Sequence, residues 1–423
     1  SISANTYQGG GAIYVSGDIT IESSLFQGNT HTNNANVDNG GGAIYVNTGS
    51  LTAVNTRFIS NAASGSGGSR GGAIYSDTSA VNITNSYFQS NRAANNGGAI
   101  VLLGQRTSRL ERVSFIDNAS SGAYGGAIYA QGTLTLSYNY FYLNRSAQSG
   151  GSVYFNQRNN AIAPGTFNAE STMFVQSSAG AAPLNGQGGA LYLQADVVNI
   201  NRCTFDTNHS STSNADSRGG AIYIDTNDSA AATPSVIKNS TFSGNQTYGG
   251  STNYGGAIYT TGEVTVTSCT FTNKNSATRG GAIFVGPGTL TIAATILVGN
   301  MADNGRDVYS EGNITSRGYN RVGVYGKGGN DTSWVADITT STTDRENSAW
   351  TTLTFFGEDA ELVDSDTYYR APAIGCTLLE TVYLLAMPLN EMTALVEADR
   401  ATNVIPFARR FTLNIDQYDI WNV

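Results

Sequence analysis

The sequence predicts an all-β protein, a right-handed parallel β-helix of about eleven three-strand coils followed by a smaller C-terminal capping region. Two repeated blocks support this prediction: a Gly-Gly-Ala-Ile-Tyr block recurs along the chain, and a Phe-x-x-Asn block alternates with it. The composition agrees, because 50 glycines, 23 tyrosines and only 13% charged residues suit stacked strands and polar turns better than long solvated helices.

The glycine block opens each repeat. Its paired glycines permit a positive φ and a close backbone approach, as a tight corner requires. The second glycine of each pair falls at Gly11, Gly42, Gly72, Gly98, Gly126, Gly151, Gly189, Gly220, Gly256 and Gly281, and a degenerate copy begins at Gly305.

An aliphatic residue follows two positions after the second glycine in every copy. We assign this column to the interior, where each buried side chain contributes about 1.5–3 kcal/mol. Its members are Ile13, Ile44, Ile74, Ile100, Ile128, Val153, Leu191, Ile222, Ile258, Ile283 and Val308.

The next column is aromatic at ten of eleven positions, with Val101 as the exception. Alternation along a strand places it outside the coil, as an exposed stripe. It could bind a ligand or a neighbouring rod, or form a self-stacking ladder that only stiffens the coil, which we favour. Its members are Tyr14, Tyr45, Tyr75, Tyr129, Tyr154, Tyr192, Tyr223, Tyr259, Phe284 and Tyr309.

Two further strands complete each predicted coil. One is an alternating segment such as Leu134-Thr135-Leu136, whose period of two indicates a strand with one buried face. The other surrounds the phenylalanine of Phe-x-x-Asn. At about 4.8 Å a coil, the stack makes a rod on the order of 50 Å long.

The asparagine of Phe-x-x-Asn is expected at a bend, where stacked amides can hydrogen-bond along the column as a structural ladder. Several of these residues, including Asn118, Asn208 and Asn245, also match the glycosylation triplet, but we interpret them as inward ladder members. The predicted ladder consists of Asn29, Asn61, Asn91, Asn118, Asn144, Asn208, Asn245 and Asn300.

The repeat fades after about residue 311, so we predict a β-helix domain over 1–320 and a cap or small appended domain over 321–423. Residues 321–423 carry all three tryptophans and one helix-like stretch, 390–400. A β-helix end exposes unpaired strand edges, which such a region would cover. Residues 1–8 lead directly into the first glycine pair, so we expect an uncovered first coil that could stack on another molecule.

The net charge of −9 and the absence of a basic run argue against nucleic acid as a partner. No apolar stretch is long enough for a membrane-spanning helix. Cys203 and Cys269 lie two repeats apart, about 9.6 Å by strand spacing, which is too far for a disulfide. We expect free thiols that act as small apolar fillers.

We predict no catalytic residue, no metal site and no cofactor. His31 and His209 lie in or beside variable loops, and we interpret both as solvated. The acidic residues are scattered, apart from pairs at 358–359 and 364–366 that could bind Ca²⁺ but that we interpret as solvated turns.

Alternating Gly-Gly-Ala-Ile and Phe-x-x-Asn blocks over residues 1–310 resemble the passenger repeats of the polymorphic outer membrane protein family, secreted β-helix adhesins of chlamydial type. The resemblance implies a surface β-helix used in adhesion. We therefore predict a non-enzymatic extracellular or cell-surface structural or adhesive protein that could assemble end to end into a filament. Its partners would be copies of itself, or a surface glycan or protein.

Two alternatives remain at this stage. The first is a carbohydrate-active β-helix enzyme, a polysaccharide lyase or hydrolase, which clustered acidic residues around a groove would favour. The second is a passive glycan-binding module that uses the tyrosine stripe.

Overall fold

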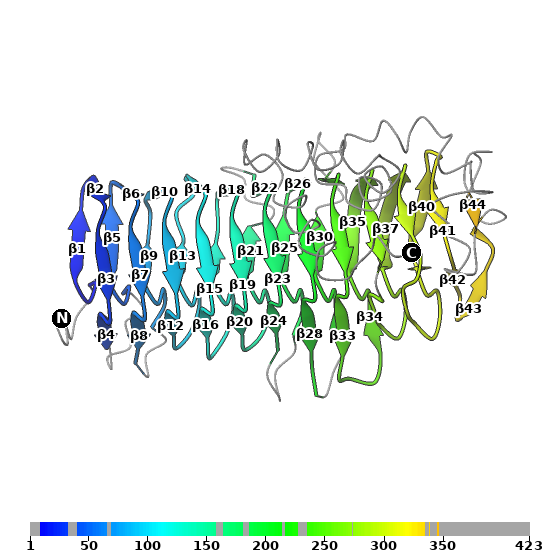
Figure 1. The fold of residues 1–423 in the computed structure, drawn as a ribbon, viewed down its shortest axis with the longest axis horizontal. Helices are drawn as coiled ribbons and strands as arrows, with labels where there is room; N and C mark the ends of the chain where they lie inside the picture. The colour runs from blue at the N-terminus through cyan, green and yellow to red at the C-terminus, as the bar shows by residue number, and fades with distance from the viewer. Residues whose placement is uncertain are drawn as a thin grey trace, which may run out of the picture.

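The computed structural model describes residues 9–32, 40–65, 69–157, 164–180, 186–213, 216–226, 235–272, 274–334, 338 and 345–346. Every regular element in these ranges is a β-strand, and the strands stack in parallel along one axis as a rod (Figure 1). The predicted all-β parallel β-helix is confirmed. The tail residues 347–423, with the predicted helix-like stretch, Cys376 and the acidic pairs, lie outside the described residues.

The largest sheet contains 22 strands and combines the strand after each glycine pair with the middle strand of each coil. The first column consists of β1 (Ile13–Ser16), β5 (Ile44–Thr48), β9 (Ile74–Ser76), β13 (Ile100–Leu102), β17 (Ile128–Ala130), β21 (Val153–Gln157), β25 (Leu191–Ala195), β30 (Ile222–Thr226), β39 (Val308–Ser310) and β42 (Tyr325–Lys327). The middle column consists of β2 (Ile19–Glu22), β6 (Ser50–Val54), β10 (Ala80–Thr84), β14 (Thr107–Glu111), β18 (Thr133–Ser137), β22 (Thr166–Glu170), β26 (Val197–Asn201), β31 (Ser235–Lys238) and β40 (Asn313–Ser316). The long strands β35 (Ile258–Thr267) and β37 (Ile283–Ala293) run through both columns, and β43 (Asn330–Thr332) pairs antiparallel with β42.

A second sheet of 12 strands carries the phenylalanines. It consists of β3 (Leu25–Gln27), β7 (Arg57–Ile59), β11 (Tyr87–Gln89), β15 (Ser114–Ile116), β19 (Tyr140–Tyr142), β23 (Met173–Val175), β27 (Thr204–Asp206), β32 (Thr241–Ser243), β36 (Thr270–Thr272), β38 (Ile296–Leu297), β41 (Arg321–Val322) and β44 (Arg345–Glu346).

A third sheet follows the ladder asparagines with short strands that were not anticipated from the sequence. It consists of β4 (Thr30–Thr32), β8 (Ala62–Ser64), β12 (Arg92–Ala93), β16 (Ala119–Ser120), β20 (Arg145–Ser146), β24 (Ser178–Ala179), β28 (His209–Ser211) and β33 (Gln246–Tyr248). A separate pair, β29 (Ser217–Arg218) and β34 (Asn253–Tyr254), lies in the loops that precede two glycine pairs.

The turn count differs from the predicted eleven. Because the third sheet has eight strands, about eight turns carry a strand in all three sheets. Beyond β33 this side of the coil is joined by isolated bridges, for example between Ser276 and Met301. The coils after β33 therefore continue to add strands to the first two sheets but not to the third.

The interior is apolar and continuous. The aliphatic column is at most 1% exposed from Ile44 to Val308, and the strands pair in register, as for Ile44 with Ile74. The phenylalanines of the second sheet stack face to face from Phe26 to Phe271, with ring centroids 4.5–5.1 Å apart. At the far end Trp334 is fully buried and packs edge-on against Tyr325, 5.6 Å away, which covers the core there.

The two glycines of each pair are needed for different reasons. In most copies the first glycine has a positive φ, such as 69° at Gly125. The second leaves no room for a side chain, because a Cβ on Gly126 would lie 2.0 Å from the carbonyl oxygen of Gly151 in the next coil. Glycine is thus required at this corner by two separate constraints.

Candidate functional site

The tyrosine stripe lies outside the coil interior, but most of it is not exposed. Tyr14, in the first described coil, is 49% exposed, Tyr129 is half-buried, and the remaining members are 1–9% exposed. The expectation of an exposed stripe is therefore wrong. The rings cover one another, since Tyr154 and Tyr192 stack at 4.6 Å and Tyr192 and Tyr223 at 4.7 Å.

Loop side chains cover the stripe as well. The Tyr124 ring lies 4.4 Å from that of Tyr154, and the guanidinium carbon of Arg218 lies 5.2 Å from the centroid of Tyr259. Burial raises the pKa of the hydroxyl of Tyr45 to about 12, with the nearby Asp77 adding to the effect. Because both ring faces are occupied along most of the column, this stripe offers little flat surface to a sugar ring.

The ladder asparagines are buried, with exposed fractions of 0–8%. A single pattern links them: the backbone N–H and the side-chain Nδ2 of each donate to Oδ1 of the next. Asn91 thus donates to Asn118 at 3.0 and 2.9 Å, and Asn118 to Asn144 at 3.1 and 3.0 Å. The second Nδ2 hydrogen of Asn118 goes back to the carbonyl oxygen of Phe88, at 3.1 Å. Because they are buried and bonded to one another and to the backbone, these side chains stabilise the coil.

The ladder has one break and one member that the sequence analysis missed. Ser177 occupies the rung after Asn144, and its hydroxyl bonds to Ser152 instead. Asn275 joins Asn245 to Asn300, although it stands four residues after its phenylalanine. Only the structure identifies it: Lys274 has a positive φ, like the residue before each other rung.

Asp307 ends the ladder. One carboxylate oxygen accepts from the backbone N–H of Asn300 at 3.2 Å and from its Nδ2 at 2.7 Å, and the other accepts from the N–H of Val324 at 2.8 Å. A carboxylate suits this position because the last amide donates and needs an acceptor. Burial raises the pKa of Asp307 to about 6, although these hydrogen bonds oppose the shift.

The interpretation of the histidines as solvated loop residues is wrong. His31 lies on β4 and is fully buried, because its ring fills the space above Gly40. Neither ring nitrogen has a hydrogen-bond partner among the described residues, and burial lowers the pKa of the imidazole. His209 lies on β28, half-buried, with its ring 5.4 Å from that of Tyr248.

The described part of the chain holds no group of three or more His, Cys, Asp or Glu side chains that could bind a metal ion. Cys203 and Cys269 are free and buried, and burial raises the pKa of each thiol to about 12. Neither thiol is therefore suited to nucleophilic chemistry near neutral pH.

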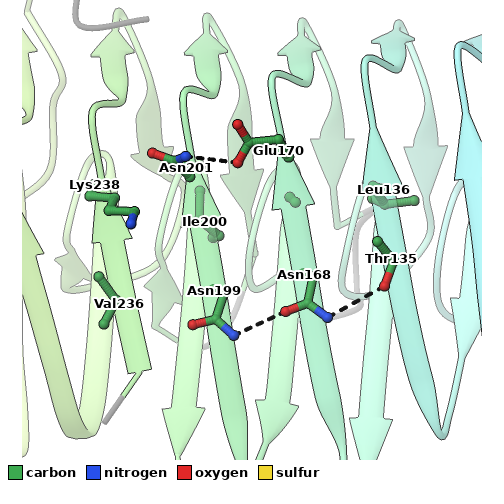
Figure 2. A pocket seen from close by; sticks show the side chains of 10 residues that line it. Thr135, Leu136, Asn168, Glu170, Asn199, Ile200, Asn201, Val236 and Lys238 are labelled. Atoms are coloured by element: carbon green, nitrogen blue, oxygen red, sulfur yellow. Dashed lines mark hydrogen bonds between the residues drawn. The ribbon is translucent and has the colours of Figure 1, made fainter. Parts of the chain in front are cut away.

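An open groove of about 300 Å³ crosses the outer face of the middle strands β18, β22, β26 and β31. Figure 2 shows its lining, in which a row of polar side chains runs across neighbouring strands. Asn199 Nδ2 donates to Asn168 Oδ1 at 3.0 Å, and Asn168 Nδ2 to the Thr135 hydroxyl at 3.4 Å. Beside them lie Glu170 and Lys238. Sequence reasoning did not single out this set, because its members stand in four different repeats.

Two segments of the chain, residues 85–102 and 239–261, match the model of the Chlamydia polymorphic membrane protein repeat. Each begins beside the phenylalanine strand of one coil and ends at the aliphatic column of the next. These two segments are similar to the repeat of that family. No curated protein and no solved structure matches the chain.

The two matched segments and the β-helix fit a surface-exposed passenger domain of an outer membrane protein. The matched family is one of generally non-enzymatic surface proteins. Among the described residues, no helix is both long and apolar enough to cross a membrane.

Proposed function

We propose that the chain is an adhesive rod, which presents its side faces to the surface of another cell. One observation carries this proposal: a buried aliphatic column and an in-register phenylalanine stack run without interruption through the coils. Such a stack makes a stiff element whose outer residues can vary without loss of the core. The repeat match and the acidic, water-compatible surface support the same role.

Adhesion can be tested with beads that carry the purified chain. Coated beads should bind cultured animal cells, and soluble chain should compete for the same sites. The control is the Gly126→Ala chain, in which a clash between neighbouring coils should disrupt the rod. Equal attachment of the two kinds of bead, or of uncoated beads, would overturn the proposal.

End-to-end assembly is a second proposal, which the stacking of the coils supports. Each coil pairs its strands in register with the coil on either side, as Ile44 does with Ile13 and with Ile74. A coil of another copy can pair with such strands in the same way. Negative-stain micrographs over rising concentration should show filaments of increasing length, whereas single rods at every concentration would contradict assembly.

A further inference from the structure

The middle strands present an outward column that is mostly threonine. In register along the rod it reads Thr20, Thr52, Asn82, Arg109, Thr135, Asn168, Asn199, Val236, Thr265, Thr291 and Thr315. Five rungs depart from threonine, and three consecutive ones among them, Asn168, Asn199 and Val236, line the groove of Figure 2. The inward neighbours Ala169 and Ile200 are at most 2% exposed, so the coil core requires the inward column but not these outward side chains.

The groove amides keep hydrogen-bonding capacity for a ligand. An asparagine side chain has two donor hydrogens and an acceptor oxygen with two lone pairs. Asn199 uses one hydrogen, toward Asn168, and no described residue donates to its Oδ1. Both side chains are half-buried, in contrast to the buried ladder amides inside the coil. Side-chain amides on neighbouring coils, with donor and acceptor positions still free, are suited to a ligand rich in hydroxyl groups.

Of the two charged side chains that line the groove, Glu170 has a cationic partner and Lys238 has no carboxylate partner among the described residues. Glu170 accepts from Asn201 Nδ2 at 2.8 Å and from the Arg202 guanidinium at 3.1 Å, so its charge is balanced. Lys238 is exposed, and no carboxylate of the described residues lies within ion-pair distance of it. A single free ammonium group favours a ligand with one negative charge, and it is too little for a nucleic acid backbone.

We propose that the groove binds an oligosaccharide that carries an acidic group, with the hydroxyls on Asn168 and Asn199 and the acidic group on Lys238. This assignment rests on the proposed adhesive function and names its ligand class. The acidic group is a carboxylate or a sulfate, which share the same charge-assisted contact with an ammonium group.

The test is a glycan array probed with the full chain, followed by titration calorimetry with the strongest oligosaccharide. The array includes uronic-acid, sialylated, sulfated and neutral members, so it separates the two sources of charge. Lys238→Gln should weaken binding about tenfold, the loss of one charge-assisted bond. Asn199→Ala should weaken it by a similar factor, and the matched control Lys327→Gln, an exposed lysine on β42, should bind as wild type. Melting curves check that all variants are folded.

The outcomes separate this inference from the adhesive function. No binding to acidic oligosaccharides, or unchanged binding by Lys238→Gln, would overturn the groove assignment even if coated beads still attached to cells. Conversely, a chain that binds acidic oligosaccharides through Lys238 but does not attach to cells would leave the groove assigned and the adhesive function refuted.

Discussion

Replacement of Asn118 by alanine should strongly destabilise the rod. The side chain takes part in four hydrogen bonds of 2.9–3.1 Å: it accepts from N and Nδ2 of Asn91, and it donates to Asn144 Oδ1 and to the carbonyl oxygen of Phe88. In the alanine variant Asn144 Oδ1 keeps its bond from the backbone N–H of residue 118, at 3.1 Å. Three buried groups lose their partner: two hydrogens of Asn91 and the oxygen of Phe88.

The cost follows from these three groups. A buried polar group without a partner costs about 1–3 kcal/mol, and the removed amide leaves room for one water molecule, which could satisfy part of the loss. We expect the free energy of unfolding to fall by about 3–6 kcal/mol. The change is local to one rung, so the unfolding transition should shift as a whole without a change in the spectrum of the folded state.

Urea unfolding at pH 7, followed by far-ultraviolet circular dichroism, measures the loss. The matched control is Asn313→Ala on β40, where the side chain is exposed and the change should be below about 0.5 kcal/mol. If the two variants unfolded at the same urea concentration as the wild-type chain, the ladder would not hold the coils together and the reasoning would be refuted.

Four further predictions concern single positions. Gly126→Ala should destabilise the chain more than Gly28→Ala in urea unfolding, because a Cβ at the first site meets backbone 2.0 Å away, whereas nothing lies within 4 Å at the second; equal losses would contradict this. The stability that depends on Asp307 should decrease by about 3 kcal/mol as the pH rises from about 3 to 7, because its folded pKa of about 6 exceeds the ordinary 3.8; urea unfolding against pH should be flatter for Asp307→Asn. Tyr223→Ser should lower the melting temperature without affecting glycan binding, because its ring faces are covered by neighbours in the stripe; the reverse pattern would reassign the stripe to recognition. In native chain treated with iodoacetamide, peptide mapping should find Cys203 unmodified, and modification at the rate of a small thiol would show that the core opens.

Repetition made the fold predictable. A lone Phe-x-x-Asn carries little information, but its recurrence places a phenylalanine at the same position in successive coils. The rings therefore stack along the rod. The turn count was less accurate, because the third side of the coil consists of strands of two or three residues after the asparagines, too short to show a period. Asn275 was missed for a related reason, since one extra residue in the turn removed it from the fixed spacing.

Exposure could not be derived from alternation. The alternation of residues along a strand predicts that a tyrosine points out of the coil. It does not predict whether loop residues such as Tyr124 and Arg218 cover that tyrosine. The same limit applies to His31, which stands beside a loop in the sequence and is buried beneath the neighbouring backbone in the fold.

The sequence by itself determined the architecture, because identical corners and identical inward side chains at every repeat allow only one stacking. The tertiary structure alone decided which outer residues meet. Asn168, Asn199 and Lys238 are 31 and 39 residues apart along the chain, as their numbers give, and they share one groove only because each coil sets its middle strand directly on the one before. In a solenoid the distance along the chain between neighbours is set by loop length, which follows no pattern, so a surface site becomes visible only when the coils are stacked.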